Sequence, residues 1–206
     1  MIINLEQLKE KYNLDIKGVI HIGGHYGQEH NTYKTNGINN LIYFEPLSGS
    51  FNRLKENIGE EGICINKALG SQTGKISMYV ESANDGQSSS ILKPKIHAEL
   101  YKHIIFHSEE IVDIDLLDNI EEIKQKEYNF INVDVQGYEL EVFKGAIQSL
   151  NKIDYIMTEI NKAELYENCA LIEDLDNFLS KYGFTRVETE WFYDHNWGDA
   201  FYIKNR

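Results

Sequence analysis

Three closely spaced glycines follow the first apolar run of the chain, and they limit the folds that it can adopt. Residues 19–22 are Val-Ile-His-Ile, Gly23 and Gly24 come directly after them, and Gly27 precedes a polar stretch that is typical of a helix. A strand that turns through glycines into a helix has room for a ligand near its main chain, and the N–H groups at the helix start lack intrahelical partners. The pattern predicts a ligand site at this turn.

A carboxylate follows the next apolar run, which is Leu-Ile-Tyr-Phe at residues 41–44. Glu45 comes directly after this run, and Pro46 comes next. A carboxylate at the end of the second strand can accept hydrogen bonds from both hydroxyls of a ribose, as it does in folds that bind dinucleotides. We therefore expect a cofactor that contains a nucleoside. The alternative for Glu45 is a solvated acid at a strand end.

Apolar runs and amphipathic stretches alternate along the rest of the chain. Strands are expected at residues 18–22, 41–44, 63–69, 75–81, 111–115, 129–133, 153–158, 184–190 and 200–204. Helices are expected at residues 4–12, 26–36, 46–59, 116–126, about 139–150 and 171–182. This alternation predicts one α/β domain over residues 1–206 with a mostly parallel sheet, in which residues 1–17 form a helical cover and residues 18–206 the core.

Length and composition exclude several classes of protein. The net charge of −13 argues against nucleic acid or an anionic membrane as the main partner, because the attraction to phosphate would have the wrong sign. The sequence has no run of roughly 18 apolar residues, as a membrane span requires, and no secretory signal at its start. We interpret the two cysteines, Cys64 and Cys169, as reduced thiols of a cytoplasmic protein.

Five short motifs extend over about residues 18–204. They are IHIGGHYG at 20–27, YFEP at 43–46, NKALG at 66–70, DVQGYE at 134–139 and GDA at 198–200. In this order they resemble the FkbM-type S-adenosylmethionine-dependent methyltransferases. The resemblance implies a Rossmann-like class I fold, with helices on both faces of a seven-stranded, mostly parallel sheet whose last strand is antiparallel. It also implies O-methylation of a hydroxyl, often on a sugar or glycan.

The resemblance further implies a site for S-adenosyl-L-methionine at the ends of the first strands. The residues expected to contact this cofactor are His21, Gly23, Gly24, Gly27, Gln28, Glu45, Pro46, Asn66, Ala68, Leu69, Asp134 and Val135. The glycines would approach the methionine part, Glu45 the ribose, and residues 66–69 the adenine. His21 stands where the family usually has an acid, whose role Glu29 or Asp134 could take. Gln136 replaces a more usual Glu.

Three residues are candidates for the chemistry. Asp134 follows a buried central strand, at the edge where open α/β sheets place ligands, and could remove the acceptor's proton or hold the acceptor hydroxyl or the methionine amine. Glu159, at the end of the next strand, is the second candidate, and each acid could instead cap a helix. His195, the third candidate, lies among aromatic residues. It could act as a general base beside a stacking surface for a sugar, or it could belong to a packed hairpin tip.

Two further features have mainly structural interpretations. His97, His103 and His107 do not have the spacing of a known zinc site, so we expect no metal. The serine-rich segment 82–90 is either a lid over the cofactor or a connector.

Three functions remain open at this point. An O-methyltransferase that acts on a small-molecule or glycan hydroxyl fits the motifs best. A nicotinamide-dependent oxidoreductase shares the glycine turn and the acid, but Gly23, Gly24 and Gly27 do not have the Gly-x-Gly-x-x-Gly spacing. A non-catalytic binding domain is favoured only by His21. The chain would also fit a module of a larger glycan-building protein.

Overall fold

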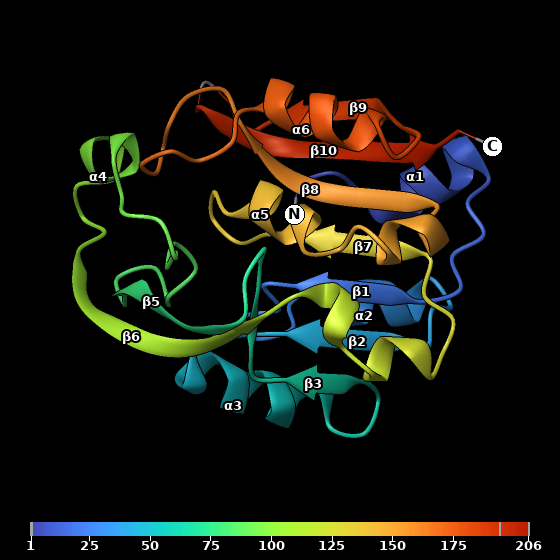
Figure 1. Cartoon of the computed structure of the whole chain (residues 1–206), viewed down its shortest axis with the longest axis horizontal. Coiled ribbons are helices and arrows are strands. Elements are labelled where there is room, and N and C mark those ends of the chain that lie inside the picture. Colours follow the sequence, from blue (N-terminus) through green and yellow to red (C-terminus); the bar gives the residue numbers. More distant parts are fainter. Residues whose placement is uncertain (1, 194, 206) are drawn as a thin grey trace.

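The computed structural model describes residues 2–193 and 195–205, and its main feature is a seven-stranded sheet. The strand order is β3-β2-β1-β7-β8-β10-β9 (Figure 1). The strands are β1 (Val19–Ile22), β2 (Leu41–Phe44), β3 (Ile63–Ile65), β7 (Phe130–Val133), β8 (Tyr155–Asn161), β9 (Phe184–Trp191) and β10 (Trp197–Lys204). Strand β10 is antiparallel to both of its neighbours, and the other pairings are parallel. The predicted mostly parallel sheet with an antiparallel last strand is confirmed.

Helices cover both faces of this sheet, which explains why its central strands are buried throughout. Every residue of β1, β2, β7 and β8 is buried. One face packs against α1 (Leu5–Tyr12), α2 (His30–Thr35) and α3 (Ser48–Ile58). The other face packs against α5 (Glu139–Lys144) and α6 (Ile172–Ser180).

A second, three-stranded sheet was not predicted. It consists of β4 (Ala68–Leu69), β5 (Gly74–Glu81) and β6 (Phe106–Asp115) in the order β4-β6-β5, with α4 (Ile96–Leu100) between β5 and β6. Figure 1 shows β5 and β6 at the left, beyond the end of the main sheet. The prediction of a single strand over residues 63–69 is therefore wrong, because β3 and β4 belong to different sheets. The amide of Asn66 donates to the carbonyls of Glu45 and Pro46, and past this point the chain enters the second sheet.

Three predicted helices differ from the structure. The segment 116–126 forms two 3₁₀ turns, η1 (Leu117–Asn119) and η2 (Glu122–Lys124), and the Asp118 carboxylate in the first accepts the N–H groups of Gln148 and Ser149. Helix α2 begins only at His30. Helix α5 ends at Lys144, and the turn η3 (Ser149–Lys152) follows. Between them, Gly145 packs so closely on Gly70 that a Cβ atom would lie 1.9 Å from the Gly70 carbonyl oxygen.

Two further observations concern membrane-spanning helices and the cysteines. Within residues 2–193 and 195–205, no helix combines the length and the apolar character that crossing a membrane requires. Cys64 and Cys169 carry free thiols.

Candidate active site

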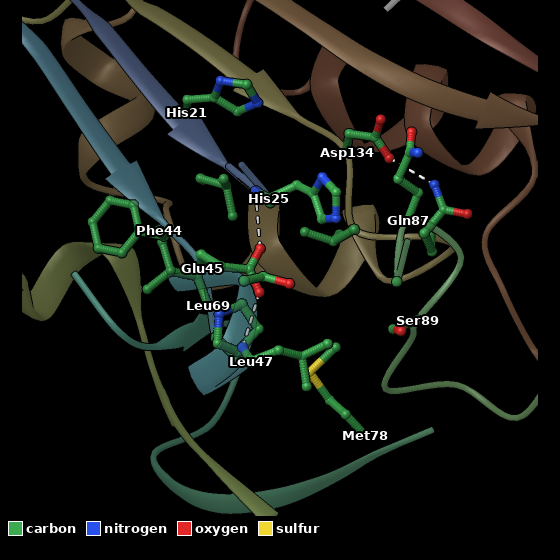
Figure 2. A pocket seen from close by; sticks show the side chains of 18 of the residues that line it. His21, His25, Phe44, Glu45, Leu47, Leu69, Met78, Gln87, Ser89 and Asp134 are labelled. Atoms are coloured by element: carbon green, nitrogen blue, oxygen red, sulfur yellow. Dashed lines mark hydrogen bonds between the residues drawn. The ribbon is translucent and has the colours of Figure 1, made fainter. Parts of the chain in front are cut away.

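One pocket brings together most of the residues that the sequence predicts to bind a cofactor. It lies where β1, β2 and β7 end and where the second sheet begins (Figure 2). The predicted residues that line it are His21, Gly23, Gln28, Glu45, Pro46, Ala68, Leu69, Asp134 and Val135. The position is the carboxyl edge of a parallel sheet, where open α/β folds place their ligands.

The chemical character of the pocket changes from one end to the other. Apolar side chains form one end, and they are Leu47, Leu69, Met78 and Ile91. Glu45 lies in the middle, and His21 and Asp134 line the opposite end. Glu29 also lines the pocket and interacts electrostatically with His21. Figure 2 shows this order, with His21 and Asp134 at the top, Glu45 at the centre and Met78 at the bottom. A ligand with a flat apolar ring, a central polar group and a charged end would match this order.

Glu45 is buried, although it lines the pocket. Its Oε2 atom accepts the N–H of His25 at 3.0 Å, and its Oε1 atom accepts the N–H of Leu47 at 2.9 Å. Burial raises the pKa of Glu45 to about 7, and these two N–H groups act in the opposite direction. A carboxylate offers about four acceptor positions, so Glu45 can also accept hydrogen bonds from a ligand.

The three glycines of the turn serve different purposes. Gly23 has φ +84°, and a Cβ atom there would lie 1.8 Å from the carbonyl oxygen of Asp134, so only glycine lets the ends of β1 and β7 approach this closely. Gly27 also has a positive φ of +79° and packs on Ile58 and Leu54 of α3. Gly24 packs on Tyr43 and Leu54. Gly23 lines the pocket, whereas the contacts of Gly24 and Gly27 are with the core.

The N–H groups of this turn are already used within the protein. The bonds run from Gly23 and Gly24 to the Phe44 carbonyl, from His25 to Glu45, from Tyr26 to the Gln28 side chain and from Gly27 to the Gly24 carbonyl. The expectation that free N–H groups at the turn would face a ligand is therefore wrong for residues 23–27. The turn instead contributes by fixing Glu45, through the N–H of His25.

His21 is buried in a polar group on the α2 side of the sheet. Its Nδ1 lies 3.2 Å from the Tyr33 hydroxyl, and its Nε2 lies 3.2 Å from the amide nitrogen of Asn132. Burial lowers the pKa of His21, so its ring is neutral at physiological pH. His21 thus does not replace the charge of the usual acid, and the carboxylates at this end of the pocket come from Glu29 and Asp134.

Three carboxylates gather where β7 and β8 end. Asp134 follows β7, Glu159 lies in β8 and Glu139 opens α5. Gln136 donates through Nε2 to Asp134 Oδ1 and to Glu159 Oε2, at 2.7 Å each. Burial, and then the charges of Asp134 and Glu139, raise the pKa of Glu159 well above its usual range. Glu139 accepts the N–H groups of Val135 and Gly137 and so fixes the turn after β7.

Some predicted residues lie elsewhere. Of the described residues that the sequence analysis assigned to the site, the pocket lining does not include Gly24, Gly27, Asn66, Glu159 and His195. Asn66 binds the carbonyls after β2, and Glu159 lies behind Gln136. His195 is in the β9–β10 hairpin, where its Nδ1 lies 2.6 Å from the Tyr101 hydroxyl. The structure does not bring His195 to the pocket.

The segment 82–90 contributes residues that the sequence analysis did not assign to the site. Gly86, Gln87 and Ser89 line the pocket. The carbonyl of Asp85 lies 2.8 Å from His25 Nε2 and accepts the Tyr26 hydroxyl at 3.0 Å, so the segment rests on the glycine turn. The lid interpretation of the sequence could have suggested these residues, because a lid must contact what it covers. In the described part of the chain, no three His, Cys, Asp or Glu side chains are grouped so that they could hold a metal ion.

Comparison with known families matches residues 21–186 to the methyltransferase FkbM domain. A curated protein, the 2-O-methyltransferase NoeI of Sinorhizobium fredii (strain NBRC 101917 / NGR234), is 32% identical over 136 residues, which are 62% of this chain. The match covers 56% of NoeI, so the chain spans little more than half the length of that relative.

Solved structures share the fold at low sequence identity. The magnesium protoporphyrin IX methyltransferase ChlM from Synechocystis PCC 6803, with bound SAM, has a TM-score of 0.56 at 10% identity, over 97% of this chain and 76% of ChlM. A putative tRNA (m1A22) methyltransferase of Streptococcus pneumoniae, in complex with S-adenosyl-L-methionine, has a TM-score of 0.54 at 12% identity, over 99% and 74% of the two chains. This likeness confirms the predicted Rossmann-like, class I fold.

Proposed function

The chain belongs to the FkbM methyltransferase family, and from this premise we propose that it transfers a methyl group to a hydroxyl of a sugar or glycan-type acceptor. S-adenosyl-L-methionine is the cofactor of this family and hence of this chain. The observation that carries the proposal is the buried carboxylate of Glu45 in the middle of a pocket that is apolar at one end and acidic at the other.

The pocket fits this cofactor part by part. Leu47, Leu69 and Met78 offer apolar surfaces for the adenine ring, and Glu45 offers acceptors for the two ribose hydroxyls. Glu29 offers negative charge near the end where the methionine amine would lie. When bound, the cofactor supplies a methyl group on a positively charged sulfur.

Asp134 is the residue that we assign to the acceptor. It lines the pocket at the acidic end, and Gln136 holds its Oδ1 atom. A positioned carboxylate can accept the proton of an acceptor hydroxyl, and an aligned acceptor has a lower barrier than one that diffuses freely. His195 has no part in this assignment, because it contacts Tyr101 away from the pocket.

Two observations support a hydroxyl acceptor that is not part of a nucleic acid. NoeI is a 2-O-methyltransferase, and 32% identity over 136 residues relates this chain to it. The net charge of −13 disfavours nucleic acid, although one structural neighbour is a putative tRNA methyltransferase. The cytoplasmic location stays a prediction from the sequence.

Calorimetric titration tests the cofactor, with S-adenosylhomocysteine and NAD as the two ligands. We expect binding of S-adenosylhomocysteine only. Preferential binding of NAD would favour the oxidoreductase, and binding of neither ligand would favour a non-catalytic domain.

Transfer of a labelled methyl group tests the acceptor, in a screen of oligosaccharides, nucleotide sugars, small alcohols and RNA. We expect transfer to a carbohydrate, and a large loss of transfer in Asp134→Asn with S-adenosylhomocysteine binding retained. Asp113→Asn is the control, because Asp113 lies on β6 and pairs with Lys75 outside the pocket. Full activity of Asp134→Asn would remove Asp134 from the proposal.

A further inference from the structure

Gln136 connects two acidic side chains that come from neighbouring strands. Its Nε2 atom lies 2.7 Å from Asp134 Oδ1 and 2.7 Å from Glu159 Oε2. An amide nitrogen carries two hydrogens, so it can donate one to each carboxyl group. No other amide side chain among the described residues donates to either of these two acids.

The surroundings of Gln136 fix the direction of its amide. Its backbone has a positive φ of 55°, and its carbonyl accepts the hydroxyl of Ser90 at 2.7 Å. Its side-chain oxygen lies 3.0 Å from the hydroxyl of Tyr166, whose single hydrogen this oxygen shares with the Ser88 carbonyl oxygen at 2.9 Å. An ionised carboxylate accepts and does not donate, so Asp134, as the proton acceptor, requires the NH₂ group on the acidic side and leaves the amide oxygen on the tyrosine side.

The acids around Glu159 determine where a proton is held. Asp134, Glu139 and Asp199 face it from the end of β7, from α5 and from β10, and Tyr166 brings a neutral hydroxyl. Carboxyl groups this close cannot all ionise, and the proton stays on the group for which burial is most costly. That group is Glu159. Glu139 and Asp199 are buried too, but each accepts two backbone N–H groups, which favour the charged form, whereas no backbone N–H group among the described residues donates to the Glu159 side chain. Asp134 is half-buried and lines the pocket.

We propose that Gln136 is a positioning residue, which aligns Asp134 as the proton acceptor while Glu159 beside it stays neutral. This inference rests on the proposed function. In the step, the O–H bond of the acceptor breaks, the proton moves to the Asp134 carboxylate, and the electron pair stays on the acceptor oxygen. The Gln136 amide stabilises the charged form of Asp134 before the proton arrives, since hydrogen bonds to a charged form favour it.

The amide also explains why the more usual Glu is absent at this position. A glutamate at residue 136 would place another acid against Asp134 and Glu159, and it could donate a hydrogen bond only while protonated. A glutamine donates at every pH. The charge of Asp134 then does not depend on the protonation of a third side chain.

The test is the pH dependence of methyl transfer in Gln136→Leu and Gln136→Glu. Without the donor, the pH at which activity rises should move upward by about one unit in Gln136→Leu, and activity should partly return at higher pH. In Gln136→Glu, the pH at which activity rises should move further upward, because the added acid opposes ionisation of Asp134. Gln148→Leu, at an exposed glutamine after α5, is the control and should have the wild-type profile.

Two outcomes separate the inference from the function on which it rests. An active wild type whose pH profile is the same in both Gln136 variants would overturn the role of Gln136 and leave the methyltransferase standing. A wild type without methyl transfer would overturn the proposed function. In that case, ¹³C NMR of the labelled carboxyl groups still decides the inference, because at neutral pH Glu159 should be protonated and Asp134 ionised in the wild type, and Gln136→Leu should weaken this difference. A protonated Asp134 beside an ionised Glu159 would overturn it.

Discussion

The carboxylate of Glu45 holds two backbone N–H groups and faces the pocket at the same time. Glu45→Ala should therefore weaken S-adenosylhomocysteine binding by about 10- to 100-fold, since hydrogen bonds to a charged group contribute about 1.5–3 kcal/mol. Glu45→Gln keeps one acceptor oxygen, so its affinity for S-adenosylhomocysteine should lie between the affinities of the wild type and Glu45→Ala. Calorimetric titration measures the affinity, with Glu56→Gln on the exposed side of α3 as the control. Unchanged affinity in Glu45→Ala would contradict the ribose assignment.

The titration of Glu45 should make cofactor binding depend on pH. Its pKa is about 7 in the folded chain, against an ordinary value of 4.5. Between these values the folded state holds more protons than the unfolded state, so this group contributes less stability as the pH rises through that window. Ribose hydroxyls donate to the ionised form, so affinity should instead rise between about pH 6 and pH 8. Glu45→Gln should remove the rise, and a rise that persists in this variant would belong to another group.

Residues at strand ends were predictable because their place in the chain decides their place in the fold. Glu45 and Asp134 follow buried strands, and all parallel strands end at one edge of the sheet, so both reach the pocket. Met78 and Ile91 line the same pocket but come from the second sheet and the segment after it. Their position depends on pairing between β5 and β6, and no local pattern reveals which distant strands pair.

Elements were predictable where their periodicity was strong and unopposed by tertiary contacts. Helix α6 and strand β2 lie close to their predicted bounds, because each has a clear apolar pattern. The segment 116–126 has the spacing of a helix, but Asp118 binds the backbone of residues 148 and 149 and leaves only 3₁₀ turns. Such a contact joins parts of the chain that are 30 residues apart, so the local helix propensity of residues 116–126 cannot predict it.

The segment 82–90 depends on one buried acid. Glu81 is 2% exposed, and its carboxylate accepts the N–H groups of Asn84 at 2.8 Å and Ser88 at 3.2 Å. Glu81→Ala should therefore loosen the segment, with amide hydrogen exchange in residues 82–90 at least about 10-fold faster, since each lost bond to a charged group is worth about 1.5–3 kcal/mol.

Binding should respond as well, because Gly86, Gln87 and Ser89 line the pocket. We expect faster release of S-adenosylhomocysteine in Glu81→Ala, measured by stopped-flow displacement. Glu109→Ala, on the exposed part of β6, should change neither quantity. Faster exchange with an unchanged release rate would mean that the segment is a connector and not a lid.

At the scale of the molecule, the pocket exists only because two sheets meet. Glu45 and Asp134 follow strands of the main sheet, whereas Leu69 and Met78 lie in β4 and β5 of the second sheet. The short turn at Asn66 is the point where the chain passes from one sheet to the other. The resemblance to a family implied the seven-stranded sheet and its antiparallel last strand, but the second sheet, which completes the apolar end of the pocket, had no counterpart in the prediction.

The N-terminal helix offers a test of how the whole molecule is held together. The sequence predicts residues 1–17 as a cover, yet Leu5 and Leu8 of α1 belong to the same buried cluster as Phe130 and Phe201 of the main sheet. The N–H groups of Ile2 and Ile3 bind the Asp199 carboxylate, at the end of that sheet where the acids gather. Helix α1 therefore behaves as part of the core.

Leu8→Ala should accordingly lower the free energy of unfolding of the entire chain by about 2–5 kcal/mol, because it leaves a cavity in that cluster. Urea denaturation measures this, and an unchanged slope with a lower midpoint would show that the molecule still unfolds as one unit. Glu10→Ala, on the exposed side of α1, should stay within about 0.5 kcal/mol of the wild type. S-adenosylhomocysteine affinity of the folded Leu8→Ala protein should not change, because Leu8 lies outside the pocket. A loss below about 0.5 kcal/mol would instead show that α1 contributes little to the stability of that cluster.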